Sequence, residues 1–143
     1  MIDENDKICD LVWFKGYTIN LKSLNTTTLP LQSQINIYTD SSKTEQHVGA
    51  GFAIFRGKDL VVTGSRIIPY EATVFQAEVM AIQIAMMKFN EIILSQDMYI
   101  KLLTDSQATL LTLNSHIIRS QLVKDTISAL NLVGTRINRL ELN

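Results

Sequence analysis

The sequence has a single cysteine, two prolines and no long run of apolar residues. One cysteine, Cys9, excludes an internal disulfide framework and is typical of a reducing compartment. No apolar run approaches the ~18 residues of a membrane-spanning helix. The acidic start, Met1 to Asp6, lacks the basic and apolar regions of a signal peptide. We therefore expect an intracellular protein, nuclear or cytoplasmic, that does not bind a membrane.

An excess of positive charge is also lacking. Thirteen basic and fourteen acidic residues give a net charge of −1, so there is no broad basic field for nucleic acid. Binding of nucleic acid would have to be local or depend on a metal ion. The chain is 46% hydrophobic over 143 residues, which is enough for one domain with a core. Internal repeats and low-complexity tracts are absent.

Two short apolar runs end in the same three residues, Thr-Asp-Ser. One covers residues 35–41 and the other residues 102–106. Isoleucine, tyrosine and threonine favour a strand, and the Asp-Ser that follows is typical of a turn or a helix cap. The pattern predicts two strands that each deliver a carboxylate, Asp40 and Asp105, at the C-terminal end.

The pattern of the remaining chain predicts a mixed α/β domain. Three strands should form an antiparallel meander that Pro69 ends, because proline cannot donate to the ladder. Thr73 and Gln76 have the spacing of a capping box that opens a helix. Ser106 and Gly134 suit the start of one later helix and the C′ position of another. The expected strands are 35–40, 49–55, 60–68, 97–105 and 137–143, and the expected helices begin near residues 73, 106 and 121.

Residues 1–34 predict a tether or linker ahead of the domain at 35–143. This segment carries acids, a small apolar patch around Trp13 and Phe14, and a polar run at 25–28. A strand or two of it could pack on a neighbour. The two aromatic residues either cover an edge of the fold or dock on a preceding domain.

Glu78 lies inside the long apolar segment 73–93, where a charge has no obvious structural reason to be. At 100° per residue, Gln76, Gln83 and Asn90 form a stripe that should face water, and Glu78 lies on the opposite side. A carboxylate there must be paired, protonated or bound to a cation. Two interpretations stay open: a structural acid, salt-bridged or at the rim of the first helical turn, and a functional one.

A helical crossover should return the chain to a strand parallel to 35–40 and beside it. Asp40 and Asp105 would then leave the sheet at one edge, where ligands of α/β sheets gather, and Glu78 would point into the same space. Ligand sets made only of oxygen favour Mg²⁺ or Mn²⁺ over zinc. The sequence has no zinc-type spacing of His and Cys, no phosphate-binding glycine loop and no Ser/His/Asp set placed for acyl transfer.

Four motifs together resemble the type HI ribonuclease H domain. They are Tyr-Thr-Asp-Ser-Ser at 38–42, Gly-Ala-Gly at 49–51, Val-Phe-Gln-Ala-Glu at 74–78 and Leu-Thr-Asp-Ser at 103–106. The wording at 74–78 is most similar to the domain that follows the reverse transcriptase of non-LTR retrotransposons. The resemblance covers residues 35–143. It implies the ribonuclease H-like fold, a five-stranded mixed sheet with helices on both faces.

The resemblance also implies an activity, hydrolysis of the RNA strand of an RNA–DNA hybrid. Asp40, Glu78 and Asp105 match three of the family's four metal-binding acids. The family uses two Mg²⁺ or Mn²⁺ ions about 3.5–4 Å apart, and three acids could still hold one. A preceding reverse transcriptase domain is an implied partner. The residues implied in contact with the hybrid are Ser41, Ser42, Gly49, Gly51, Gln76 and Ser106.

Two departures from the family pattern bear on activity. Ser41 stands where the family usually has glycine, and the loop histidine and fourth acid have no match. The chain ends at Asn143, inside the expected last strand, so we expect a domain incomplete at its C-terminus. The alternative hypothesis is a degenerate remnant that binds nucleic acid and cuts nothing. A phospho-acceptor receiver domain is disfavoured, because receivers alternate strand and helix throughout.

Overall fold

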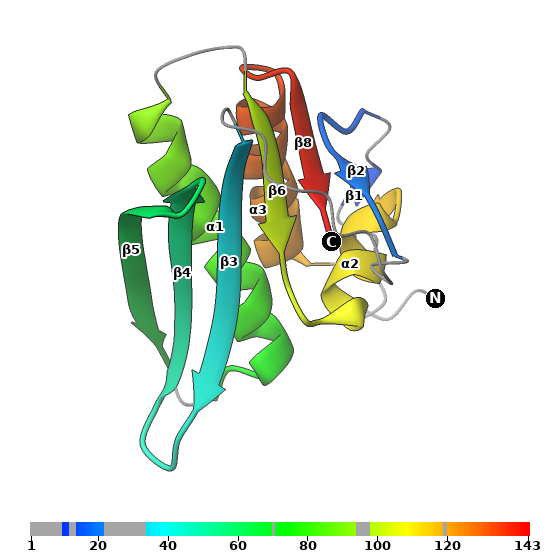
Figure 1. Cartoon of the computed structure of the whole chain (residues 1–143). Helices are drawn as coiled ribbons and strands as arrows, with labels where there is room; N and C mark the ends of the chain where they lie inside the picture. The colour runs from blue at the N-terminus through cyan, green and yellow to red at the C-terminus, as the bar shows by residue number, and fades with distance from the viewer. Residues whose placement is uncertain (1–9, 12–13, 22–33, 70, 94–97, 119) are drawn as a thin grey trace.

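A six-stranded mixed sheet forms the centre of the computed structural model (Figure 1). The structure describes residues 10–11, 14–21, 34–69, 71–93, 98–118 and 120–143. The sheet has the strand order β2-β8-β6-β3-β4-β5, and β1 pairs with β7 in a separate two-stranded ladder. The strands are β1 (Asp10–Leu11), β2 (Thr18–Ile19), β3 (Gln34–Lys43), β4 (Val48–Arg56), β5 (Asp59–Ile68), β6 (Tyr99–Leu103), β7 (Ile117–Ile118) and β8 (Arg139–Leu142). The helices are α1 (Val74–Ile92), α2 (Gln107–Asn114) and α3 (Gln121–Gly134).

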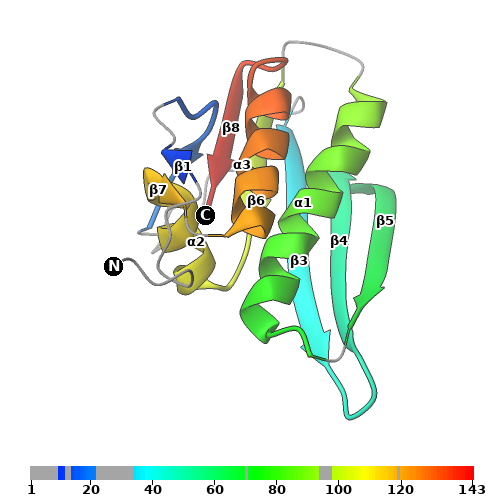
Figure 2. The same cartoon turned by 180° about the vertical axis from the view of Figure 1, so that it is seen from behind.

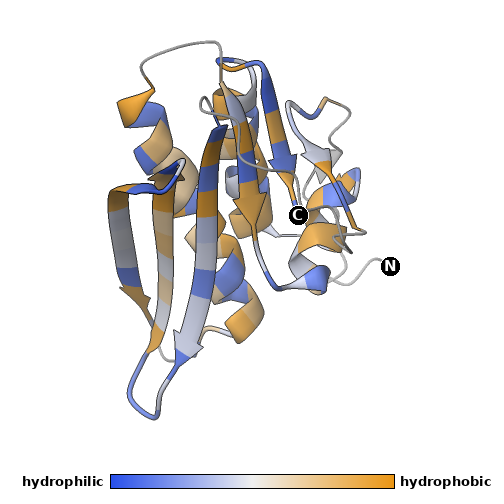
Figure 3. Ribbon diagram, in the orientation of Figure 1, coloured by the Kyte–Doolittle hydropathy of each residue, from blue (hydrophilic) through white to orange (hydrophobic). Residues whose placement is uncertain are grey.

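The predicted meander is confirmed as β3, β4 and β5, paired antiparallel. Gly57 turns the β4–β5 hairpin with a φ of 61°, which glycine adopts without steric strain. β5 ends at Ile68, directly before Pro69. The hydrophilic colouring of the β3–β4 hairpin in Figure 3 agrees with the exposure of residues 42–47. Sequence neighbours therefore build this half of the sheet.

The predicted return to a parallel strand is also confirmed. β6 pairs parallel with β3, and β8 pairs parallel with β6. The capping box at the start of α1 is present: Gln76 N–H donates to the Thr73 hydroxyl at 3.0 Å, and Thr73 N–H donates to the Gln76 side chain at 2.9 Å. The Ser106 hydroxyl caps α2 by accepting a hydrogen bond from the Thr109 N–H at 3.1 Å.

Both long helices lie on one face of the sheet and pack against each other. Figure 2 shows α1 and α3 side by side in front of the strands. The apolar side chains of α1 pack between the sheet and α3, and eight of its residues are buried. The predicted water-facing stripe of α1 is therefore only partly correct, since Gln83 and Asn90 are half-buried and only Gln76 is exposed.

The sheet has a sixth strand, β2, because part of the N-terminal segment joins the domain. β2 pairs parallel with β8, and Tyr17 is buried in the core. Thr18 and Ile19 thus belong to the sheet and Tyr17 to the core, in the segment where we expected a tether with a strand or two packed on a neighbour. Phe14 is exposed, and Trp13 and the other parts of the expected tether lie outside the described residues.

Gly134 does not have the C′ role that we predicted. It is the last residue of α3, and Thr135 is the C-cap in αR conformation. A Cβ atom at Gly134 would lie 2.0 Å from the carbonyl oxygen of Gly16. The glycine therefore allows the N-terminal segment to approach the end of the helix, a contact between residues more than a hundred positions apart.

Candidate active site at the carboxyl edge of the sheet

Asp40 and Asp105 lie at the same edge of the sheet. Tyr38 of β3 is level with Leu103, the last residue of β6, and the same register continued by two residues makes Asp40 level with Asp105. The Thr39 hydroxyl donates to the Leu103 carbonyl at 3.3 Å, which holds the two strand ends together. Both carboxylates are exposed, so water, a cation or a substrate can reach them.

Glu78 reaches the start of α2, the helix that follows Asp105. The buried Thr109 hydroxyl lies 3.3 Å from a Glu78 carboxylate oxygen and 2.8 Å from the Ser106 hydroxyl. Thr109 has one hydroxyl proton, so both contacts are hydrogen bonds only if Ser106 donates to Thr109 and Thr109 donates to Glu78. Among the described residues Glu78 has no salt bridge to Lys or Arg. The half-buried carboxylate is thus linked to the segment that carries Asp105.

The three acids do not form a ready cation site. No group of three His, Cys, Asp or Glu side chains in the described parts of the chain is close enough to hold a metal ion. Their chemistry nevertheless suits Mg²⁺ or Mn²⁺, which prefer oxygen ligands, and Asp40 and Asp105 lie at one edge of the sheet. Asp40 and Asp105 are exposed, so their side chains are free to change rotamer.

Four of the residues proposed to touch nucleic acid line one depression next to Asp40. This depression has a volume of about 220 Å³, and its floor is the β3–β4 ladder, where Asp40 is opposite Gly51 and Ser42 opposite Gly49. A Cβ atom at Gly49 would come within 3.0 Å of the Ser42 hydroxyl oxygen, so glycine leaves that hydroxyl its place. The residues that line the depression are Asp40, Ser41, Ser42, Gly49, Ala50, Gly51 and Ser65.

Ser41, Gln76 and Ser106 have structural roles at this edge. Gly57 has the only positive φ recorded for a glycine in the described chain, and Ser41 is an ordinary strand residue paired with Ala50. Its N–H donates to the Asp40 carboxylate at 2.8 Å. Serine at this position therefore brings no backbone strain. Gln76 and Ser106 are occupied in helix capping, so a contact with nucleic acid would compete with a cap.

The sequence interpretation missed two residues near the site, Thr109 and Ser65. Thr109 follows Ser106 by three positions, the spacing of a capped first turn, and this signal could have found it. Ser65 is opposite Gly51, and only the register of β4 with β5 shows that it lines the depression.

Comparison with known proteins gives a structural match without a sequence match. No family model and no curated protein matches the sequence. Ribonuclease H1 from the halophilic archaeon Halobacterium salinarum superposes with a TM-score of 0.59 and 19% identity, over 77% of this chain and 83% of that chain. The N-terminal ribonuclease H domain of a Mycobacterium tuberculosis protein, solved as a fusion with maltose-binding protein, superposes with a TM-score of 0.62 and 11% identity. That match covers 78% of this chain and 81% of the other.

No helix in the described ranges combines the length and the hydropathy of a membrane span. The predicted fold class is confirmed, with six strands in the sheet where five were expected. Six strands in mixed order, an antiparallel meander, a helical crossover and a parallel return give this chain a ribonuclease H-like fold.

Proposed function

We propose that this chain is a divalent-metal-dependent nuclease that hydrolyses the RNA strand of an RNA–DNA hybrid. The observation that carries the proposal is the β3–β6 register, because it starts Asp40 and Asp105 from one level of neighbouring parallel strands. Glu78 joins them through Thr109 and Ser106 at the head of α2. The motif wording at 74–78 supports a finer proposal, descent from a retrotransposon domain that follows a reverse transcriptase. Such an enzyme would work in the nucleus or cytoplasm.

The residues have separate roles in this proposal. Asp40, Glu78 and Asp105 would hold Mg²⁺ or Mn²⁺, which supplies an activated water and stabilises the leaving oxygen. Thr109 orients Glu78 by its hydrogen bond, and the Ser41 N–H orients Asp40. The hydroxyl of Ser42 and the glycine backbones at 49 and 51 line a depression where 2′-hydroxyls and phosphates can approach. Gln76 and Ser106, at two helix starts, complete the proposed nucleic-acid surface.

A second function is favoured by one observation, the lack of a close three-acid group in the described chain. A domain that keeps this fold and the depression beside Asp40 could bind a hybrid without cutting it. Cleavage and binding therefore have to be measured separately.

The test is cleavage of an end-labelled RNA–DNA hybrid in Mg²⁺ and in Mn²⁺. We expect metal-dependent cutting of the RNA strand, lost by at least about a hundredfold in Asp105→Asn because a metal ligand is gone. Asp125→Asn is the matched control and should cut normally, because Asp125 is an exposed aspartate on α3 that accepts a hydrogen bond from Gln121. Hybrid binding is followed by fluorescence anisotropy on the same samples. Binding without cutting would overturn the nuclease proposal in favour of the binding function. The absence of both cutting and binding would contradict both proposals.

A further inference from the structure

β5 is a long edge strand that no other described strand covers. β5 is the outermost strand on one side of the sheet and spans Asp59–Ile68, whereas β2 at the opposite edge has two residues. An edge strand offers a row of unpaired N–H and C=O groups with which another strand can pair. β5 has no lysine and no internal proline, and Leu60, Val61 and Ile67 on it are exposed apolar side chains.

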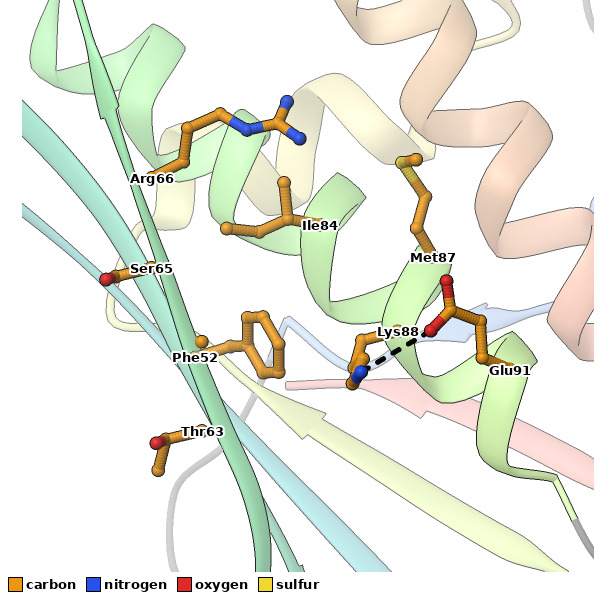
Figure 4. A pocket seen from close by; sticks show the side chains of 9 residues that line it. Phe52, Thr63, Ser65, Arg66, Ile84, Met87, Lys88 and Glu91 are labelled. Atoms are coloured by element: carbon orange, nitrogen blue, oxygen red, sulfur yellow. Dashed lines mark hydrogen bonds and ion pairs between the residues drawn. The ribbon is translucent and has the colours of Figure 1, made fainter.

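A hollow of about 330 Å³ runs along this edge between β5 and α1 (Figure 4). In Figure 4, Phe52 and Arg66 point toward the helix, while Thr63 and Ser65 point to the other side of the strand. A Cβ atom at Gly64 would lie 2.5 Å from the Phe52 ring, so the ring covers the space that a side chain at 64 would need. If another strand paired with β5, the side chains of that strand on the helix side of the sheet would lie over this hollow.

The two charges of β5 lie symmetrically about its middle. Thr63, near the middle of β5, pairs with Ala53 of β4. Arg66 pairs with Ala50 and Asp59 pairs with Arg56, so each charge lies three β4 positions from Ala53. The two distances are equal because β5 has one extra residue at the register shift opposite Ile54 and Phe55. Side chains alternate between the two faces along a strand, so Ala50 and Arg56 lie on the face opposite to Ala53. Their partners Arg66 and Asp59 share that face, which is the helix side of the sheet. Neither has an oppositely charged partner among the described residues.

We propose that β5 pairs antiparallel with β5 of a second copy of this chain, with the two-fold axis at Thr63. An isologous interface pairs residue i with j and j with i, so Asp59 of each copy is opposite Arg66 of the other. The strand is thus complementary in charge to itself at two points. In the same register Val62, a helix-side residue, is opposite Gly64 of the other copy and fills the space over the Phe52 ring.

The surroundings of the hollow agree with this partner. Lys88 and Glu91 form a 3.4 Å ion pair at its rim, so the adjoining helix surface is electrically neutral. The exposed Met87 beside them is apolar. A second copy would continue the sheet and place its own α1 on the same face of it.

The experiment is sedimentation equilibrium of the whole chain over a wide concentration range. The wild type should be a monomer–dimer equilibrium. Asp59→Arg and Arg66→Asp should each weaken the dimer by about tenfold, because each places like charges opposite one another twice. The double variant D59R/R66D should regain the wild-type dimer constant within about threefold, because the swapped charges are complementary again.

A matched control is Glu45→Arg, which makes the same charge change in the exposed β3–β4 hairpin and should leave the dimer unchanged. Circular dichroism of each variant checks that the fold is intact. A wild type that is monomeric at every concentration overturns the proposal, as does a double variant that stays as weak as the single ones. Asp59 and Arg66 line neither the depression beside Asp40 nor the carboxyl edge, so the outcome is independent of hybrid cleavage.

Discussion

The two halves of this molecule are held together by contacts of different range. In the meander β3–β5, each strand pairs with its neighbour in the chain. The other half, with β6, β8, α2 and α3, is tied to the N-terminal segment by hydrogen bonds between distant residues. Tyr17 donates to the Leu113 carbonyl at 2.8 Å, Lys15 to the Ser115 carbonyl at 2.8 Å, and Gly16 N–H to the Asn131 side chain at 2.7 Å.

This difference bears on the candidate site. Asp40 is positioned by the local pairing of the meander, whereas Asp105 follows a strand whose second neighbour, β8, is itself paired with the N-terminal β2. Long-range contacts close loops of about a hundred residues, which carries a large entropic cost. The Asp105 side of the site therefore depends more on the integrity of the whole chain.

The largest expected effect comes from Gly134→Ala, which attacks the distant contact directly. Its Cβ would lie 2.0 Å from the Gly16 backbone, so the N-terminal segment must shift or leave. We expect the free energy of unfolding to fall by about 1–3 kcal/mol, measured by urea denaturation. Gly51→Ala is the control in the meander, where the nearest atom to a new Cβ is 3.6 Å away. Equal losses in the two variants would remove the distinction between the halves.

Tyr17→Phe should weaken the same long-range contact by about 1 kcal/mol at pH 7, because a buried hydrogen bond to Leu113 is lost. Burial also raises the pKa of Tyr17 above its ordinary value. The unfolded chain therefore loses the phenolic proton first, so this contribution is complete below about pH 10 and disappears as the pH rises further.

The measurement is urea denaturation of both proteins from pH 7 to 11. The wild type should lose more stability than the Phe variant above pH 10. Tyr99, whose pKa is raised by burial and by its hydrogen bond to Glu141, is present in both proteins and affects both curves equally. Parallel curves would contradict the assignment to Tyr17.

Thr73→Ala should lower the free energy of unfolding by about 1 kcal/mol, because it removes the N-cap of the helix that carries Glu78. Thermal unfolding followed by circular dichroism measures the loss. Ser128→Ala, on the exposed surface of α3, is the control and should be neutral or slightly stabilising, since alanine favours the helix. A loss confined to thermal stability, with cleavage intact, would mean that the first turn of α1 is not needed to position Glu78.

Thr109→Val should lower the free energy of unfolding by about 1 kcal/mol, because the shape is kept while the two hydrogen bonds of the hydroxyl, with Glu78 and with Ser106, are lost. If the proposed nuclease is correct, hybrid cleavage should fall about tenfold, since Glu78 loses its orienting donor. Thr112→Val, whose hydroxyl bonds only the Ala108 carbonyl of its own helix, is the matched control. Unchanged cleavage in Thr109→Val would show that Glu78 does not depend on α2.

Much of the fold could be predicted from the sequence, because its signals are local. The turn at Gly57, the stop at Pro69, the capping box of Thr73 and Gln76, and the Ser106 cap each act within a few residues. The order of the predicted strands and helices along the chain is then compatible with only a few sheet topologies. β2 could not be predicted in this way, because two residues carry no periodicity and its partner β8 lies at the other end of the chain.

The candidate site divides in the same way. Asp40, Glu78 and Asp105 are recognisable in the sequence, since two acids follow strand-forming runs and the third interrupts an apolar helix. Only the tertiary structure shows that Thr109 stands between Glu78 and Ser106, that Ser65 lines the depression beside Asp40, and that α1 and α3 share one face. The sequence alone determined where β5 ends and where α1 and α2 begin, because capping and turn formation are short-range. Packing decided the rest, because some contacts join residues that are far apart in the chain and no local sequence pattern predicts them. Examples are the contact of Gly134 with Gly16 and that of Thr109 with Glu78.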